Sequence, residues 1–285
     1  MKKAGLIVNI NKDADLEITK KLISVFNKNG ISLLSADEKL RNAFGTRNDI
    51  VSEDELIKTA EALFCLGGDG TLLNVAGKML PYNIPLMGIN LGHLGFLTEI
   101  DEYELEHKIS FLADDEYDIE KRIMIDVSLF IGEKLITGSC LNDFVVSRGA
   151  SPRLIDIKAY IDDCFVDSFN GDGVIVSTPT GSTAYSLSCG GPIADPAMKV
   201  MLITPVCPHN IYSRTFLVDI ARTIRLEAVS KKGCFALCTF DGQDSYEIDQ
   251  PVKAYIKTSE KELRLIRLNK RNFYDVLRKK LYNRG

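Results

Sequence analysis

The sequence lacks an excess of positive charge and any long apolar run. Its 35 Lys and Arg residues are outnumbered by 39 Asp and Glu residues, which gives a formal charge of −4. General electrostatic attraction to nucleic acid is therefore not expected, and any anion must bind at a local site. The start of the chain, Met1-Lys2-Lys3-Ala4, leads into a short apolar strand without a signal-peptide core. No run approaches the roughly 20 apolar residues of a membrane span. We expect a cytoplasmic protein that binds neither nucleic acid nor a membrane.

Cysteine and histidine are too scattered to indicate a metal site. The seven cysteines form no CxxC pair, and no nearby histidine completes a ligand set with Cys234 and Cys238. The three histidines, His93, His107 and His209, lie far apart along the chain. We expect most of the cysteines to be buried as small apolar side chains. The sequence therefore does not indicate which residues would bind a metal.

What the sequence does contain is a change of pattern near residue 117. With 285 residues, 45% of them hydrophobic, the chain is long enough for two domains. Before that point strand and helix patterns alternate, which predicts a parallel sheet covered by helices. After it, short alternating strands and hairpin turns predict a mainly β domain. The predicted domains are residues 1–116, an α/β domain, and residues 117–267, a mainly β domain. The last segment, 268–285, is expected to return to the first domain.

The pattern also predicts individual elements. Strands are expected at Ala4–Ile10, Ile31–Leu34, Ala62–Leu66, Ile84–Ile89, Ile123–Ile131, Leu154–Ile161, Val174–Val176, Thr223–Val229, Phe235–Phe240 and Val252–Ile256. Helices are expected at Leu16–Asn27, after Ser52, after Thr71, after the hydroxyl-rich loop near residue 180, and at Asn272–Tyr282. Ligands should bind beyond the carboxyl ends of the parallel strands.

The segment Leu66-Gly67-Gly68-Asp69-Gly70-Thr71 joins a buried strand to a helix. Residues without a Cβ let backbone N–H groups approach phosphate oxygens, and the helix N-terminus adds positive partial charge. Asp69 would be repelled by a phosphate, so it either performs chemistry, binds a bridging cation or turns away. The alternative interpretation of this acid is an ordinary turn former.

Four further segments carry polar groups at strand ends. Asn142-Asp143 stands at the head of an apolar strand, where the pair could bind the two hydroxyls of a ribose or simply cap the strand. The stretch from Asn170 to Pro192 places a strand between Gly171-Asp172-Gly173 and a loop rich in hydroxyls, which can bind phosphate or base edges. The Asn90–Leu97 run and the turn Phe240-Asp241-Gly242-Gln243 are weaker signals, and a plain hairpin explains the second.

Together, and in this order along the chain, these segments resemble the NAD kinase family. The glycine turn alone is shared with diacylglycerol-type lipid kinases and phosphofructokinases, whereas the run from Thr178 to Tyr185 is far more specific. The resemblance implies an α/β phosphate-donor domain over residues 1–116 and a mainly β dinucleotide-binding domain over residues 117–267. It also implies a final helix that packs on the first domain, and a homo-oligomer, either a dimer or a tetramer. It also implies that ATP, with a divalent metal ion expected to be Mg²⁺, phosphorylates the 2′-hydroxyl of the adenosine ribose of NAD to give NADP.

The resemblance also implies roles for individual residues. Asp69 matches the general base, and the phosphates of ATP would bind at Gly67, Gly68, Gly70 and Thr71. The residues that match NAD-binding positions are Phe96, Asn142, Asp143, Arg153, Asn170, Asp172, Thr183, Ala184, Tyr185, Ser186, Leu187, Ser188 and Gln243. Many relatives have Glu where this chain has Asp143.

Two other functions are compatible with parts of the sequence. A diacylglycerol-type lipid kinase would share the glycine turn, but it has no need of the Asn142-Asp143 pair. A non-enzymatic dinucleotide sensor would use the binding residues and have no need of Asp69. Because no Lys follows the glycines as in a P-loop, the metal is expected to supply much of the positive charge.

Overall fold

The computed structural model describes residues 1–44, 49–92, 95–229, 235–268 and 272–282. The chain divides into two compact units, Met1–Lys121 with Leu263–Gly285, and Arg122–Glu262. The sequence pattern put these transitions at 116/117 and 267/268. The bounds differ because β6 (Asp118–Arg122) and β19 (Leu263–Arg267) both join the sheet of the first unit.

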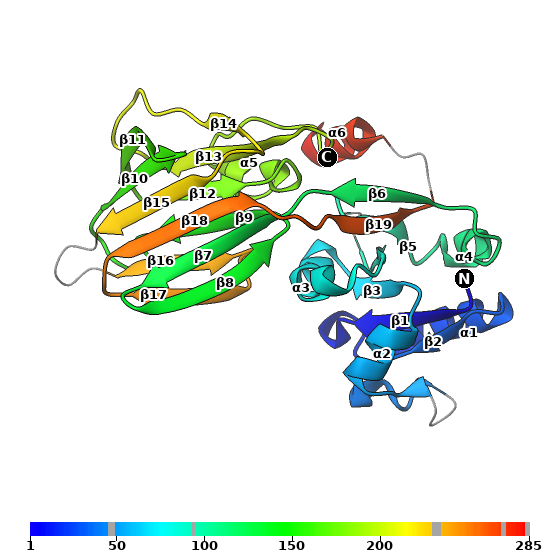
Figure 1. Cartoon of the computed structure of the whole chain (residues 1–285). Coiled ribbons are helices and arrows are strands. Elements are labelled where there is room, and N and C mark those ends of the chain that lie inside the picture. The colour runs from blue at the N-terminus through cyan, green and yellow to red at the C-terminus, as the bar shows by residue number, and fades with distance from the viewer. Residues whose placement is uncertain (45–48, 93–94, 230–234, 269–271, 283–285) are drawn as a thin grey trace. The chain divides into compact units, whose positions relative to one another are not determined.

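The first unit is a sheet of seven strands with helices around it (Figure 1). Its other strands are β1 (Lys3–Val8), β2 (Ser32–Leu34), β3 (Leu63–Gly67), β4 (Leu86–Asn90) and β5 (Thr98–Asp101). Its helices are α1 (Glu17–Lys28), α2 (Glu53–Thr59), α3 (Asp69–Met79), α4 (Leu105–Ala113) and α6 (Phe273–Tyr282), with short 3-10 helices η1 (Ile10–Lys12), η2 (Glu38–Leu40) and η4 (Leu80–Tyr82). The expected helix after Ser52 is α2, and the Ser52 hydroxyl caps it by accepting the Glu55 N–H at 3.2 Å.

The strand order of this sheet creates a site for ligands. The order is β2-β1-β3-β4-β19-β6, with β5 beside β4. The strands β1 and β3 are parallel neighbours, but the chain leaves β1 toward β2 and later continues from β3 toward β4. Such a reversal is a topological switch point, and ligands of parallel sheets bind at the carboxyl ends of the strands that flank it. The expected position beyond β3 therefore coincides with the most favourable edge of the sheet.

Helices cover both faces of the sheet. Side chains of α1 and α4, including Phe26 and Ile109, share one buried cluster with Leu6, Phe64 and Met87 of the strands. Successive strand residues point to opposite faces, so Gly5 and Gly88 face the other way. Leu56 of α2 packs over Gly5, and Leu72 of α3 packs over Gly88. Both layers of helices thus bury the sheet, as the nearly continuous apolar strands predict.

The second unit contains two six-stranded antiparallel sheets (Figure 1). One has the order β11-β10-β15-β18-β7-β8 and the other β14-β13-β12-β9-β16-β17. The strands are β7 (Ile125–Ile131), β8 (Lys134–Cys140), β9 (Asp143–Ser147), β10 (Ile155–Ile161), β11 (Cys164–Gly171), β12 (Gly173–Ser177), β13 (Val200–Val206), β14 (Phe216–Asp219), β15 (Ile224–Val229), β16 (Ala236–Phe240), β17 (Asp244–Ile248) and β18 (Val252–Thr258).

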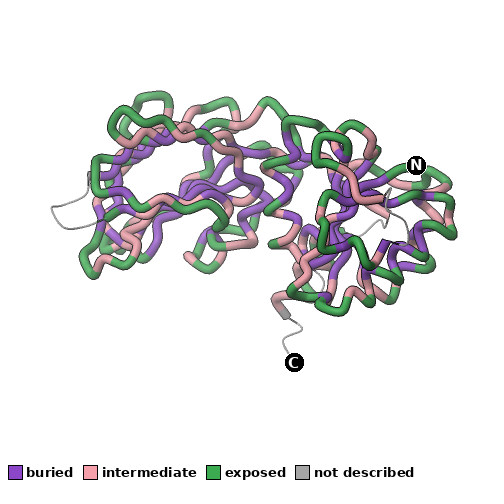
Figure 2. The backbone as a smooth tube through the Cα atoms, turned by 90° about the horizontal axis from the view of Figure 1, so that it is seen from below, coloured by how far each residue is buried: buried purple, intermediate pink, exposed green. Residues whose placement is uncertain are grey.

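The two sheets share one core. Alternate residues of each sheet, such as Val127 and Leu226 in one and Val146 and Val174 in the other, belong to a single buried cluster. Figure 2 shows stretches of buried backbone, in purple, in this unit. This is a β-sandwich, in which the inner faces of the sheets pack together. The predicted fold class, an α/β domain with a parallel sheet and a mainly β domain, is confirmed.

Several local expectations need correction. The strand expected at Ala4–Ile10 ends at Val8, and Ile10 begins η1. The helix expected near residue 180 is only a 3-10 turn, η5 (Thr180–Thr183), followed by the one-turn α5 (Tyr185–Ser188). Three of the six described cysteines are buried, whereas Cys164 and Cys207 are exposed at the ends of strands. Cys234 and His93 lie outside the described residues.

Candidate functional site

The glycine turn closes around a threonine hydroxyl at the end of β3. A Cβ on Gly67 would lie 2.2 Å from Oγ1 of Thr71, so only glycine fits there. The same hydroxyl accepts the Gly68 N–H at 3.4 Å and the Asn9 amide at 3.3 Å. Because Asn9 directly follows β1, these bonds join the carboxyl ends of β1 and β3 at the switch point. The predicted strand, turn and helix are all present, and α3 begins at Asp69.

The carboxylate of Asp69 is fixed by three backbone donors. It accepts the N–H groups of Phe96 at 2.8 Å, Leu97 at 3.0 Å and Thr98 at 3.2 Å. The approach is so close that a Cβ on Gly95 would lie 1.7 Å from Oδ1 of Asp69. Asp69 is therefore neither a simple turn former nor a free surface acid. One glycine and three backbone N–H groups hold this carboxylate in one place.

A buried ion pair supports the segment that holds Asp69. Arg267 of β19 donates from Nη1 to the Leu97 carbonyl at 3.2 Å and to Glu99 at 3.1 Å. Glu99 is only 2% exposed, and its other oxygen accepts the Leu268 N–H at 2.9 Å. Arg267 also donates from Nε to Glu120 at 2.5 Å. The guanidinium thus ties three elements of the first unit together directly behind the residues that contact Asp69.

The Asn90–Leu97 run shapes the same part of the first unit. The Asn90 amide donates to the Gly92 carbonyl at 2.6 Å, which holds the bend after β4. Phe96 is half-buried, and its ring lies 6.1 Å from that of Phe273 in α6. Lys280 of the same helix lies over the Phe96 ring at 4.7 Å. The contacts confirm the expected return of the last helix to the first unit.

In the second unit, Asp241 rather than Asp143 organises the Asn142-Asp143 pair. The Asp241 carboxylate accepts the backbone N–H groups of Leu141 at 2.7 Å, Asn142 at 2.7 Å and Asp143 at 2.9 Å. Burial raises the pKa of Asp241, although these three bonds oppose the shift. Asp143 is 6% exposed, and burial together with the charge of Asp241 raises the pKa of Asp143 to about 7.

The raised pKa of Asp143 predicts a pH-dependent stability. Its carboxyl group has a pKa of about 7 in the folded chain against 3.8 ordinarily, so between these values the folded state keeps a proton that the unfolded state releases. The free energy of unfolding should therefore fall as pH rises through this window and level off above it. An Asp143→Asn variant removes the titration. We expect its melting temperature, relative to wild type, to rise by several degrees between pH 5 and pH 8, at about 2–4 °C per kcal/mol. A difference that is the same at every pH would contradict this account.

The hydroxyl-rich loop is held mainly by its own hydroxyls. Thr178 donates to the Leu141 carbonyl at 2.5 Å, and Ser182 donates to the Pro179 carbonyl at 2.6 Å. The Ser186 and Thr204 hydroxyls are 2.8 Å apart. A Cβ on Gly181 would lie 2.1 Å from the Asn142 carbonyl oxygen, so the loop packs closely against the Asn142-Asp143 pair. Ser186 is buried, whereas Tyr185 is 45% exposed.

The other predicted NAD-binding residues of the second unit differ in their contacts and exposure. Asp172 is the single residue between β11 and β12, and it pairs with Arg148 Nε at 2.6 Å. The Asn170 amide donates to Asp156. Arg153 and Gln243 are exposed. Thr183 and Ala184 are half-buried, as is Leu187, while Ser188 is exposed.

Comparisons with known proteins agree over the whole chain. Residues 4–117 match the model for the ATP-NAD kinase N-terminal domain, and residues 141–268 match that for the ATP-NAD kinase C-terminal domain. An NAD kinase of Caldanaerobacter subterraneus subsp. tengcongensis is 45% identical over 100% of both chains. The chain belongs to the NAD kinase family. Another NAD kinase, of Acetivibrio thermocellus, is 39% identical over 100% of this chain and 99% of its own.

Solved structures share the NAD kinase fold. A yeast NADH kinase complexed with NADH superposes with a TM-score of 0.89 at 23% identity, covering 100% of this chain and 89% of the yeast chain. An NAD kinase from Archaeoglobus fulgidus in complex with ATP gives a TM-score of 0.76 at 23% identity, over 99% of this chain and 100% of the other. At this level of identity the likeness establishes the arrangement of strands and helices.

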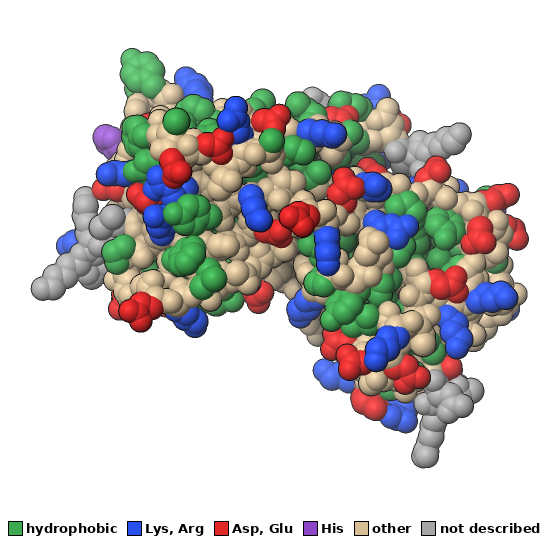
Figure 3. All heavy atoms as spheres, viewed as in Figure 1, with side chains coloured by type: hydrophobic (Ala, Val, Ile, Leu, Met, Phe, Trp, Pro, Cys, Tyr) green, Lys and Arg blue, Asp and Glu red, His purple; other side chains and the backbone are tan. Residues whose placement is uncertain are grey.

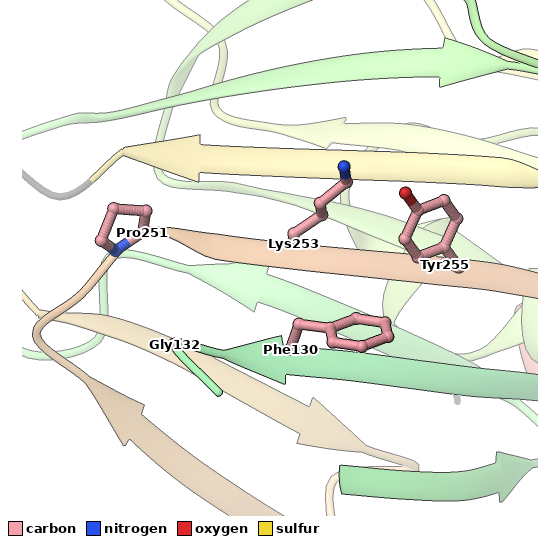
Figure 4. A pocket seen from close by; sticks show the side chains of 5 residues that line it. All are labelled: Phe130, Gly132, Pro251, Lys253 and Tyr255. Carbon is pink, nitrogen blue, oxygen red and sulfur yellow. The ribbon is translucent and has the colours of Figure 1, made fainter. Parts of the chain in front are cut away.

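A hollow in the second unit is lined by none of the predicted site residues. Figure 3 shows Lys and Arg interspersed with Asp and Glu over the face in view. An open hollow on the sheet that contains β18 is lined by Phe130, Gly132, Pro251, Lys253 and Tyr255 (Figure 4). Among the described residues, no three His, Cys, Asp or Glu side chains are grouped to hold a metal ion. None of the described helices is long and apolar enough to cross a membrane.

The sequence does not indicate the residues that hold the predicted site residues in place. Arg267, Glu99 and Arg148 lie far along the chain from the groups that they contact, and no local motif marks them. Asp241 was noted only as part of a turn. Its signal is the Asp-Gly pair at the end of β16, where Asp241 has a positive φ of 49°. Such a conformation suggests a special role for the residue, but it is visible only in the structure.

Proposed function

We propose that this chain transfers the terminal phosphate of ATP to the 2′-hydroxyl of the adenosine ribose of NAD, forming NADP. The observation that carries the proposal is the match, over its full length, to NAD kinases at up to 45% identity. The fixed carboxylate of Asp69 at the switch point supports it from the structure. A dinucleotide sensor has no need to hold an acid in this way.

The proposed role of Asp69 is to orient the attacking hydroxyl and accept its proton. The hydroxyl oxygen forms a bond to the terminal phosphorus, the bond to the bridging oxygen breaks, and ADP leaves. Three of about four acceptor positions on the carboxylate are filled by backbone N–H groups, and Oδ2 carries only one of them. Oδ2 therefore keeps a direction free for the ribose hydroxyl. Phosphoryl transfer depends mainly on such positioning and on charge stabilisation.

The remaining binding roles follow the family resemblance. Gly67, Gly68, Gly70 and Thr71 would bind the phosphates of ATP, where the start of α3 adds positive partial charge. The predicted NAD contacts would come from Phe96, from Asn142-Asp143, and from the residues around the hydroxyl-rich loop. Because the Ser186 hydroxyl already pairs with Thr204, we expect Ser186 to contact NAD through its backbone.

The metal and the assembly are parts of the same proposal. A kinase that uses ATP requires a divalent metal ion, and we propose that Mg²⁺ enters with the nucleotide, since phosphate oxygens are preferred ligands of Mg²⁺. We also propose a homo-oligomer, a dimer or tetramer, located in the cytoplasm. Light scattering of the purified protein distinguishes these oligomers from a monomer.

The test is direct. Purified protein is incubated with ATP, Mg²⁺ and NAD, and NADP is measured with an NADP-specific dehydrogenase. Parallel reactions replace NAD with vesicles that contain diacylglycerol, or omit ATP. We expect NADP only when ATP and NAD are both present. Phosphorylation of the lipid without formation of NADP would indicate a lipid kinase, and binding of NAD without turnover would indicate a sensor.

A further inference from the structure

The turn of this chain lacks the lysine that follows the glycines in a P-loop, yet positive charge reaches it from the last helix. Nζ of Lys280 in α6 lies 3.9 Å from Oδ2 of Asp69, the oxygen with only one backbone donor. The same ammonium group lies 4.7 Å from the centre of the Phe96 ring. Its side chain is 35% exposed. A cation that is only partly withdrawn from solvent keeps donors for a further anion.

The position of Lys280 is set by packing rather than by the ion pair alone. Phe273 lies about two helical turns before Lys280 in α6, and its ring packs against that of Phe96 at 6.1 Å. Phe96 is itself the residue whose N–H holds Oδ2 of Asp69 at 2.8 Å. The aromatic contact therefore fixes the helix against the very segment that fixes the acid. An exposed ion pair at 3.9 Å contributes little by itself.

A second lysine reaches the turn at Gly68. Nζ of Lys12, at the end of η1, lies 3.0 Å from the position that a Cβ on Gly68 would occupy. Lys12 follows β1, and Gly68 follows β3, so this ammonium group spans the switch point of the sheet. The turn is thus approached by two lysines, by Lys12 at Gly68 and by Lys280 at Asp69 and Phe96.

We propose that Lys280 and Lys12 are the cationic residues of the phosphate site, with Lys280 contacting the phosphoryl group during transfer and Lys12 binding the phosphates of ATP before it. This inference rests on the proposed function and adds two residues to it. The pair of ammonium groups replaces the single P-loop lysine as a source of fixed positive charge. It also explains how the carboxylate of Asp69 tolerates phosphates nearby, since the two lysines outweigh its charge.

The proposal is tested with Lys280→Met and Lys12→Met, which keep an unbranched apolar side chain one heavy atom shorter than lysine and remove its charge. Lys279→Met and Lys20→Met are the matched controls, because both lysines are exposed on helices and lie outside the site. Steady-state rates are measured with ATP varied at saturating NAD, and the reverse. Binding of inorganic tripolyphosphate is measured separately by calorimetry, which does not depend on turnover.

Loss of a charge-assisted contact is expected to change kcat, the KM for ATP or the dissociation constant of tripolyphosphate by about 10- to 100-fold. For Lys280→Met we expect the change in kcat, with the KM for NAD nearly constant and much of the rate recovered in Lys280→Arg. For Lys12→Met we expect a higher KM for ATP and weaker binding of tripolyphosphate. If both variants match their controls, the assignment of the lysines is wrong. If Lys280→Arg does not recover the rate, and the melting temperature of the Lys280 variants falls together with their rate, Lys280 has a structural role and the assignment is also wrong. Absence of NADP from the wild type would instead overturn the proposed function, and tripolyphosphate binding would still test the lysines.

Discussion

An Asp69→Asn variant is expected to form NADP about 1,000-fold more slowly than the wild type, within the usual range for loss of a general base. The amide cannot accept the proton from the ribose hydroxyl. It also cannot reproduce the present hydrogen bonds, because the carboxylate accepts three N–H groups through both oxygens. With its oxygen placed at Leu97 and Thr98, the amide directs its NH₂ group at the Phe96 N–H. The rate should therefore fall for reasons of both chemistry and position.

Three measurements separate these two reasons. The affinity for NAD and the melting temperature report whether the segment around Phe96 has moved, and single-turnover rates report the chemical step. We expect NAD to bind more weakly and the protein to lose a few degrees of melting temperature, with the single-turnover rate falling by a much larger factor than the affinity. A variant that turns over at the wild-type rate would show that Asp69 is not the base, without affecting the assignment to the NAD kinase family.

A Gly95→Ala variant is expected to lose at least about 100-fold in kcat, the effect of a displacement of about 1 Å at a reacting group. The new methyl group would lie 1.7 Å from Oδ1 of Asp69 and 2.3 Å from its Cγ. Either the carboxylate leaves its three donors or the segment after Gly95 moves away. We expect the free energy of unfolding to fall by about 1–3 kcal/mol, as for other overpacked sites.

A double-mutant cycle tests the cause of this loss. The three nearest atoms that the methyl group would meet all belong to the side chain of Asp69. In an Asp69→Ala background, Gly95→Ala should therefore destabilise the protein much less than in the wild type, giving a coupling energy of about 1 kcal/mol or more. Equal destabilisation in both backgrounds would place the clash elsewhere. Urea unfolding of the four proteins provides the required free energies.

The parts of the molecule that could be predicted from the sequence are those determined by short segments. The periodicity of Leu16–Asn27 and the cluster of glycines before Thr71 depend on neighbouring residues, so α1 and the turn after β3 were predicted with small errors in their ends. After the hydroxyl-rich loop near residue 180 the sequence predicts a longer helix than the structure contains, because the hydroxyl groups there bond to the protein itself. Ser182 and Thr178 bond to backbone groups of their own unit, which shortens the expected helix to a single turn.

Long-range partners could not be predicted in this way. Nothing near Leu97 in the sequence indicates that Arg267 will bond to its carbonyl, and nothing near Asp69 indicates Lys280. These contacts depend on the order of strands in the sheet, which brings β19 between β4 and β6. The raised pKa of Asp143 is similar, since it depends on burial and on Asp241, about 100 residues later. The sequence motif indicates the residue proposed to react, and the topology determines what surrounds it.

The insertion of β19 between β4 and β6 also has a consequence for biosynthesis. On the ribosome, residues 1–121 emerge well before residues 263–267, so the nascent first unit has a gap in its sheet while the second unit is being translated. Domains usually fold as they emerge, but here the first unit cannot complete its sheet until the second unit has been translated. Arg267 and Lys280 then arrive together with the missing strand and helix. A partially translated chain therefore has the glycine turn and the three backbone donors of Asp69 but neither Arg267 nor Lys280, and the proposed phosphate site becomes complete only in the last step of folding.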